Sequence, residues 1–397
     1  MNTQKILSLS ETCTGCFACY NICPKNAITM PENEEGFYFP SVDNDKCIQC
    51  GLCDKVCPQV TGTLKNKMCK AYYGWSLSET IRKNSSSGGM FRLLADYVIE
   101  KGGIVYGASF NFKELIRLEC RSTEVVSLED LQRSKYVQSY IGYAFREIKA
   151  KLQNGKYVLF CGTPCQTAGL KAFLGKDYSN LIMADFVCHG VPSMDLLRKH
   201  LDYLKIKNLK KIVFRPKNRG WVDDFEVYYT KKRPAKPADM AVRKVPWQLD
   251  EYFDTFQRYQ SIRRSCRCCS YCNGDRASDI TLADFWRIKD YDPQLWSPKG
   301  VSMILANTEK GLSIIDIIRC DSKCVIEEVP LQYVSYVYER NRTDLDSPYQ
   351  NKVRDKFLHD VYSIGYEKAL GKNGLKVRKL EITKYRIKEF VKRVINK

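Results

Sequence analysis

Apolar and polar positions alternate along the middle of the chain in a strand–turn–helix order. Three short apolar runs predict buried strands: residues 104–110, 157–160 and 181–187. Residues 90–98 carry apolar side chains at helical spacing, and glycines follow at 102 and 103. Further helices are predicted to begin at Pro164 and near Ser193, each directly after a strand. This order predicts parallel strands in an α/β domain that opens near residue 71.

The pattern changes at the C-terminal end. Residues 372–397 hold ten Lys or Arg residues against two Glu, which supplies +8 of the formal charge of +19. Five apolar residues share one helical face there: Ile387, Phe390, Val391, Val394 and Ile395. Residues 346–397 are therefore predicted to be a basic helical tail. The favoured interpretation is a helix docked on its own domain, and the alternative is contact with an anionic membrane surface or an acidic partner.

Composition limits the class of protein. Hydrophobic residues make up 44% of the 397, and no stretch approaches the roughly 18 apolar residues of a membrane span. Residues 1–10 have one lysine and no long apolar region, so no secretory signal is predicted. Nineteen cysteines in such a chain favour a reducing cytoplasm. The basic charge suits an acidic electron carrier, an anionic membrane or a phosphorylated substrate, and no nucleic-acid-binding signature is present.

Two cysteine runs near the N-terminus share the spacing C-x2-C-x2-C-x3-C-P, which wraps [4Fe–4S] clusters. The fourth cysteine of each run crosses to the other cluster. The predicted ligands are Cys13, Cys16, Cys19 and Cys57 for one cluster and Cys47, Cys50, Cys53 and Cys23 for the other. Zinc, which takes two pairs of thiolates, fits this doubled pattern less well. Residues 1–60 are therefore predicted to be an α+β ferredoxin-like domain with two clusters, and residues 61–70 a linker.

Further cysteines lie where strands end. Cys165 and Cys188 follow adjacent predicted strands, at the edge where parallel sheets bind ligands. With Cys266 and Cys269 they are candidates for a third cluster. Spacing alone does not select these four, since Cys161, Cys268 and Cys272 compete. A zinc site within residues 266–272 and a reactive thiol at the helix start are alternatives.

A serine–glycine turn at residues 85–89 leads into the helix at 90–98. Backbone N–H groups at a helix N-terminus suit phosphate. Many helices begin with a serine cap, so the turn alone indicates phosphate binding only weakly.

Six separated motifs occur in a fixed order: SSSGG at 85–89, SKY at 134–136, GTPCQ at 162–166, CHG at 188–190, C-x2-C at 266–269 and DIT at 279–281. Together they resemble the family of beta subunits of coenzyme F420 hydrogenases and dehydrogenases. The resemblance covers about residues 71–345, and a fused ferredoxin unit is common in that family.

The resemblance implies an FAD-binding α/β domain with its own [4Fe–4S] cluster. The implied cluster ligands are Cys165, Cys188, Cys266 and Cys269, and the implied flavin-binding residues are Ser87, Gly88, Gly89, Lys135, Tyr136 and Ser139. Cys161, Cys268 and Cys272 are additional to that set, so exchange of a ligand stays open. His189 is favoured as a structural residue, and it is also the best candidate for a proton donor near the flavin.

These expectations describe a flavin- and iron–sulfur-dependent oxidoreductase. Clusters carry single electrons, and a flavin converts them to the two-electron chemistry of an organic substrate. An acidic carrier such as ferredoxin is the expected donor, a small molecule the expected substrate, and a partner subunit is compatible with the family. The alternatives are a non-catalytic electron-transfer subunit and, with less support, a redox sensor that binds nucleic acid.

Overall fold

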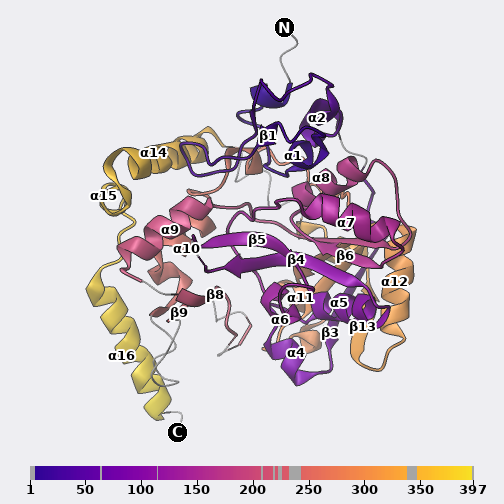
Figure 1. Cartoon of the computed structure of the whole chain (residues 1–397). Coiled ribbons are helices and arrows are strands. Elements are labelled where there is room, and N and C mark those ends of the chain that lie inside the picture. Colours follow the sequence, from indigo (N-terminus) through magenta and orange to yellow (C-terminus); the bar gives the residue numbers. More distant parts are fainter. Residues whose placement is uncertain are drawn as a thin grey trace.

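The computed structural model describes residues 5–62, 65–113, 115–206, 209–217, 220–221, 226–231, 243–337 and 347–395. One large sheet lies at the centre of the molecule (Figure 1). The cysteine runs form a small unit at one end, and the last helices lie along one side (Figure 1). In the described part of the chain, we find no helix with both the length and the apolar character of a membrane span.

The central sheet contains eight strands. They are Lys70–Ser76 (β3), Ile104–Asn111 (β4), Arg117–Ser122 (β5), Val158–Cys161 (β6), Leu181–Phe186 (β7), Ile280–Asp284 (β11), Ser302–Ala306 (β12) and Cys324–Val329 (β13). Their order is β13-β3-β12-β11-β7-β6-β4-β5. Strands β4, β6, β7 and β11 run parallel, which confirms the predicted α/β core. Antiparallel strands extend the sheet at both edges, a feature that the sequence pattern did not predict.

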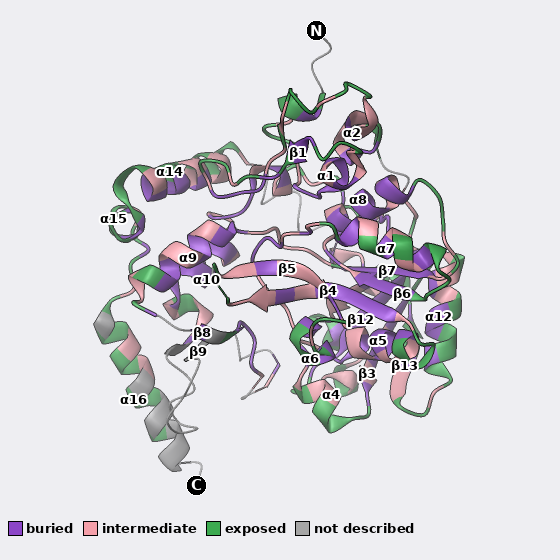
Figure 2. Cartoon of the chain, viewed as in Figure 1, coloured by how far each residue is buried: buried purple, intermediate pink, exposed green. Residues whose placement is uncertain are grey.

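Helices cover both faces of this sheet. One face packs against α5 (Met90–Glu100) and α12 (Glu309–Arg319), and the other against α7 (Ala144–Gln153) and α8 (Pro164–Leu174). Alternate strand residues divide between the two cores, with Leu159 in the first and Phe160 in the second. Because both faces are covered, the strands are nearly continuous apolar runs, and buried residues concentrate there (Figure 2).

The N-terminal unit is built from short elements. They are Lys5–Ser8 (η1), Ala18–Ile22 (α1), Ile28–Thr29 (β1), Ser41–Val42 (β2), Leu52–Lys55 (α2) and Pro58–Thr61 (α3). The sequence between the cysteine runs predicts a strand–turn–strand with strands at residues 27–30 and 37–39. In the structure β1 pairs with β2, so the second strand lies beyond residues 37–39, where Tyr38 forms a single bridge with Glu32. Ile6, Phe17 and Met30 join the core beneath α7 and α8. The unit is thus packed on the sheet domain.

A second packed region lies beside the sheet. It contains Met194–Tyr203 (α9), Leu209–Val213 (β8), Glu226–Lys231 (β9), Arg243–Pro246 (β10), Glu251–Gln257 (α10), Pro348–Ile364 (α14) and Tyr366–Lys372 (α15). Phe357, Leu358 and Val361 of α14 share its core with Phe37 of the N-terminal unit. Residues 348–375 therefore belong to the folded body. The sequence also predicts a Lys/Pro-rich loop at residues 231–236, which lies, except for Lys231, outside the described residues.

The last helix is Lys379–Ile395 (α16). It extends away from the rest of the chain in Figure 1. The sequence favoured docking of its apolar face on its own domain. That prediction is wrong for Ile387 and Val391, which are 58% and 45% exposed.

Shorter helical segments connect the larger elements. They are Glu79–Lys83 (α4), Leu128–Leu131 (α6), Trp247–Leu249 (η3), Arg264–Cys266 (η4), Ile288–Tyr291 (α11), Pro293–Leu295 (η5) and Leu331–Tyr333 (η6).

Candidate electron-transfer and flavin site

The cysteine runs enclose two pockets in the crossed arrangement that their spacing predicts. The inner pocket has about 350 Å³ of empty space, including space open to solvent, and its lining contains Cys13, Cys16, Cys19 and Cys57. The outer pocket has about 370 Å³, and its lining contains Cys23, Cys47, Cys50 and Cys53. Each pocket thus gathers three cysteines of one run and the fourth of the other.

The backbone repeats in the two runs. Gly15 and Gln49 occupy equivalent positions, as do Phe17 and Gly51, and all four have a positive φ between 53° and 70°. Left-handed residues turn each loop back on itself, so that three cysteines face one space. The duplication of the sequence is therefore also a duplication of conformation.

Burial governs the ionisation of these thiols. It raises the pKa of Cys16 to about 12 and that of Cys53 to about 11. A buried thiol becomes a ligand only as a thiolate, which a bound metal stabilises. The pockets therefore fit a metal cluster better than they fit free thiolates. Among the described residues, no three His, Cys, Asp or Glu side chains are arranged to hold a single metal ion.

The structure also brings Cys165, Cys188, Cys266 and Cys269 together, and we call these four the third thiol group. Burial is the main cause that raises the pKa of Cys188, and nearby Cys266, Cys165 and Cys269 raise it further. Burial likewise raises the pKa of Cys269 to about 12, with contributions from Cys266 and Cys165. The four thiols are thus close enough to interact electrostatically.

Three local features assemble this group. A capping box of Thr163 and Gln166 begins α8 and fixes Cys165 in its first turn. Pro192 and Ile262 form an antiparallel bridge that brings Cys266 beside the loop of Cys188. Ala168 of α8 packs with Tyr271 and Ala277, against which Cys165 and Cys269 also pack.

The three competing cysteines, Cys161, Cys268 and Cys272, have different surroundings from the four of the third thiol group. Charged neighbours of Cys161 are Asp185 and Lys135, not the four thiols. Cys268 is exposed. Cys272 donates to the carbonyl oxygen of Cys269 at 3.0 Å and is the one competitor beside the group.

The inner pocket and the third thiol group are neighbours. A Cβ atom on Gly169 would lie only 3.0 Å from Sγ of Cys16, so glycine lets the first cysteine run approach α8. Cys165 lies one helical turn before Gly169 on that helix. Cys16 and Cys165 also influence each other electrostatically. Electron transfer between two clusters held here would cross a short distance.

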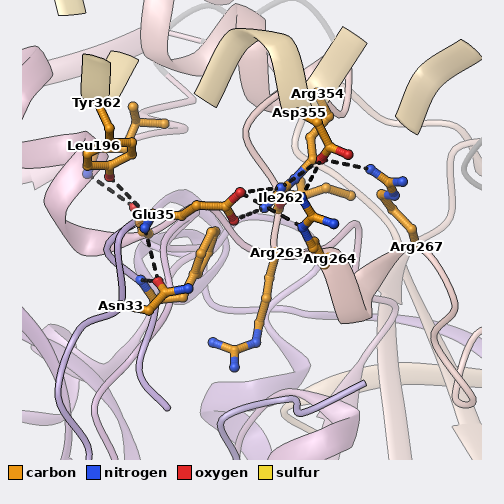
Figure 3. Close-up of polar contacts among 12 residues, drawn as sticks. Asn33, Glu35, Leu196, Ile262, Arg263, Arg264, Arg267, Arg354, Asp355 and Tyr362 are labelled. Carbon is orange, nitrogen blue, oxygen red and sulfur yellow. Dashed lines mark hydrogen bonds and ion pairs between the residues drawn. The ribbon is translucent and has the colours of Figure 1, made fainter. Parts of the chain in front are cut away.

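Ion pairs and hydrogen bonds hold the N-terminal unit against α14 (Figure 3). Arg354 of α14 is fully buried; its Nη1 donates to Oε1 of Glu35 at 2.7 Å, and its Nε donates to the carbonyl oxygen of Ile262 at 2.8 Å. Tyr362 donates to the carbonyl oxygen of Glu35 at 2.8 Å. Asp355 pairs with Arg354 and Arg264. We call these contacts the Glu35–Arg354 interlock, which joins α14, the N-terminal unit and the segment before Cys266.

A cationic group surrounds the serine–glycine turn that precedes α5. Its members are Arg82, Arg133, Lys135, Arg215 and Lys217. Nζ of Lys217 donates to the carbonyl oxygen of Ser87 at 2.9 Å, and Arg133 donates to that of Asn84 at 3.0 Å. Within the described residues, Arg215 is the only one of the five in an ion pair, with Asp284. Basic side chains therefore outnumber the acidic ones around the turn.

Burial lowers the pKa of two of these lysines. It lowers the pKa of Lys135 to about 7, and it lowers the pKa of Lys217 to about 7 with further contributions from Arg215 and Arg82. An anion bound here would favour the charged lysines and so raise both pKa values. The chemistry of this donor set fits a diphosphate.

Three of the predicted flavin-binding residues, Lys135, Tyr136 and Ser139, lie in the segment 134–139. At one end, Oγ of Ser86 accepts from the backbone N–H of Ser134 at 2.8 Å. At the other, Oγ of Ser139 accepts from Gln166 at 2.9 Å, beside Cys165. Tyr136 between them packs on the rings of Phe214, Phe253 and Phe256. Residues 134–139 thus run from the cationic turn to the third thiol group.

The remaining predicted residues have structural contacts. The hydroxyl of Ser87 donates to the carbonyl oxygen of Val301 at 2.8 Å, and the N–H of Gly88 donates to Ser302 at 2.9 Å. Gly89 precedes α5 with a φ of 105°. His189 stacks on Tyr259 with ring centroids 4.0 Å apart. These contacts agree with the structural interpretation of His189, and its role as a proton donor stays a prediction.

Comparison with known proteins is consistent with these features. Residues 155–331 match the C terminus of the coenzyme F420 hydrogenase/dehydrogenase beta subunit, and residues 12–60 match the 4Fe-4S dicluster domain. The chain therefore carries the C-terminal domain of coenzyme F420 hydrogenase/dehydrogenase beta subunits together with a 4Fe-4S dicluster domain. The resemblance stated from the motifs is confirmed.

Two relatives align with most of this chain. It is 22% identical to the F subunit of F(420)H(2) dehydrogenase from Methanosarcina mazei, over 84% of this chain and 90% of that protein. It is 25% identical to coenzyme F420-dependent sulfite reductase of Methanocaldococcus jannaschii, over 81% of this chain but 48% of that protein. A chain of the F420-reducing [NiFe] hydrogenase complex of Methanosarcina barkeri aligns at 17% identity and a TM-score of 0.47, over 74% of this chain and 94% of that one.

Sequence patterns do not predict a role for three residues of this site, Arg263, Arg354 and Lys217. Arg263 and Arg354 are fully or almost fully buried, and Lys217 is half-buried at the cationic turn. A charged residue is rarely buried, and nothing in the sequence distinguishes Arg354 or Lys217 among the 64 Lys and Arg residues of the chain. The one available signal is that Arg263 lies three residues before Cys266.

Proposed function

We propose that this chain is an iron–sulfur flavoprotein oxidoreductase. It takes electrons from a ferredoxin-like donor and delivers them, through three [4Fe–4S] clusters and FAD, to an organic two-electron acceptor. When bound, the clusters would supply one-electron transfer, and the flavin would couple it to two-electron chemistry. The supporting observation is that two thiol-lined pockets and a third thiol group lie next to one another in the fold.

The order of the three sites supports a relay. The outer pocket has an exposed lining at Cys50 and at Ile48, which is 58% exposed. The inner pocket lies against α8 and the third thiol group through Cys16 and Gly169. The donor would therefore dock at the outer pocket, and the chain's own residues would hold each further site within reach of the last.

The cationic group supports FAD as the dinucleotide. Its diphosphate would lie at the turn of residues 85–89, near Arg82, Arg133 and Lys217. Residues 134–139 connect this turn to Cys165, which suits a cofactor that extends from the cations toward the third thiol group. In this arrangement the flavin ring, not a side chain, would supply the two-electron chemistry.

The acceptor and partners follow from chemistry and relatives. The names of both relatives contain F420, so a deazaflavin coenzyme is the first acceptor to test. The exposed apolar residues and charge of α16 suit an acidic partner or an anionic membrane surface. Nineteen free cysteines favour a reducing cytoplasm as the compartment.

A second candidate is a non-catalytic electron-transfer subunit that supplies a partner enzyme. The observation that favours it is the name of the relative from Methanosarcina mazei, which is one subunit of a dehydrogenase. A flavin that reacts with no small-molecule acceptor, but loses its electrons to a co-purified subunit, would select this candidate.

Iron and flavin analysis of anaerobically purified protein tests the main proposal. We expect about twelve irons and one FAD per chain, since each cluster holds four irons. EPR spectra of the reduced protein should show three interacting clusters. Protein that contains zinc and no flavin would exclude the proposal.

A further inference from the structure

Arg263 lies between the inner pocket and the third thiol group. It is 1% exposed, and its Nε donates to the carbonyl oxygen of Cys13 at 2.7 Å. The acidic groups that act on its guanidinium are Cys13, Cys266 and Cys165. One buried cation therefore faces thiols from both sites.

The Nε of Arg263 is hydrogen-bonded, but the N–H donors of its two terminal nitrogens are not fully used. Its Nη1 and Nη2 are buried and have no oxygen or nitrogen partner among the described residues; the side-chain interaction of the guanidinium is with the thiol of Cys13, a predicted cluster ligand. Arginine has five N–H donors, and unpaired buried donors are costly. Such an arginine suits an anion that the protein chain itself does not provide.

A second buried arginine shows the contrast. Arg354 is also inaccessible to solvent, but it is paired with Glu35 and Asp355. The side chain of Arg263 points away from that network (Figure 3). Its guanidinium lies 4.0 Å from the ring centroid of Phe39, an attraction that does not compensate its charge with an anion. Four-thiolate clusters are net anions and match this need.

We propose that Arg263 is a positioning residue whose charge is shared by the clusters of the inner pocket and the third thiol group, and that it raises the reduction potentials of both. The inference rests on the proposed function. Adding an electron makes a cluster more negative, and a nearby cation stabilises that state more than the oxidised one.

The shared charge also suits transfer between the two sites. One electron leaves the Cys13 side and arrives at the Cys165 side, so one site is oxidised as the other is reduced. Arg263 stays protonated, and no proton moves. The total negative charge beside the guanidinium is unchanged, because what one side loses the other gains.

The test is a redox titration of the full-length, anaerobic protein, followed by EPR. Arg263→Met removes the charge and keeps the length of the side chain. At a fixed potential it should lower the ratio of reduced to oxidised forms at least tenfold for the inner and third clusters, which equals about 59 mV for a one-electron couple. The outer cluster should not shift. Arg263→Lys should recover most of the change.

Arg258→Met is the matched control, since the Arg258 side chain is 60% exposed and its loss should shift no cluster. Wild-type protein without about twelve irons would exclude the proposed function itself. In fully loaded protein, unchanged potentials in Arg263→Met would overturn the inference. Iron loss from both Arg263 variants would also overturn it, because Arg263 would then be needed for the folded structure and not for the reduction potentials. Iron loss from the Met variant alone would support it.

Discussion

Each N-terminal pocket brings four cysteines together, and so does the third thiol group. They differ in where along the chain those cysteines come from. Each pocket takes three cysteines from one short run, whose left-handed residues such as Gly15 and Gly51 fold the loop around its contents. The third thiol group takes Cys165 from a helix start, Cys188 from just beyond a strand end, and the Cys266–Cys269 pair from the end of η4 and the turn that follows it. Its geometry depends on the whole sheet.

This difference decides what each site depends on. A local loop needs few contacts, and the N-terminal unit is accordingly exposed around Cys50. The assembled group needs the parallel pairing of β6 and β7, and the bridge between Pro192 and Ile262. Changes in the sheet domain should therefore affect the third site and leave the two pockets loaded.

The largest effect is expected from a cysteine of the assembled group. Cys188→Ser should remove about four of about twelve irons, because one thiolate of a four-ligand cluster is lost. Cys165→Ser and Cys269→Ser should give the same loss, although the three residues lie on separate segments. Iron per chain and EPR of the anaerobic protein measure it.

Cys268→Ser provides the control, since Cys268 is exposed between two members of the group. It should keep every iron. Full iron content in Cys188→Ser would mean that the four thiols do not hold a cluster, and the comparison between local and assembled sites would lose its basis.

The same difference explains what the sequence predicted. The cysteine runs were assigned from spacing alone, and β6 and β7 were visible as apolar runs because both faces of the sheet are covered. The third thiol group came only from resemblance, since no spacing relates Cys188 to Cys266. The antiparallel edge strands and the buried Arg354 depend on tertiary partners that a local pattern does not contain.

A smaller effect is expected where the two regions meet, at the Glu35–Arg354 interlock. Glu35→Gln leaves the buried Arg354 without its bidentate partner. The free energy of unfolding should fall by about 2 kcal/mol, less than for a fully buried pair because the Glu35 side chain is 22% exposed. Urea unfolding of the anaerobic protein measures the change.

Glu34→Gln is the matched variant, because the adjacent Glu34 is exposed. It should change stability by less than about 0.5 kcal/mol. Equal stability of the two variants would show that Arg354 finds another partner, and that the N-terminal unit does not rely on this contact for its place.

The smallest effect is the pH dependence of stability and of FAD affinity. It is expected from the cationic turn and not from the thiol sites. Burial lowers the pKa of Lys135 and of Lys217 to about 7, so the flavin-free folded state holds fewer protons than the unfolded state between about pH 7 and the ordinary lysine pKa of 10.5. Stability of the flavin-free protein should accordingly rise with pH in this window. A bound diphosphate favours the charged lysines, so FAD binding takes up protons and its affinity should fall as pH rises above 7.

We expect FAD to bind roughly tenfold more weakly at pH 8.5 than at pH 6.5, a change equivalent to about one pKa unit. Fluorescence titration of flavin-depleted protein measures the dissociation constant. Lys217→Met should weaken binding at both pH values and flatten the dependence, whereas Lys83→Met, which removes an exposed lysine of α4, should leave both unchanged. Iron content should not vary across this range. An affinity that rises with pH would contradict a diphosphate at this turn, because the two buried lysines lose their charge in that direction.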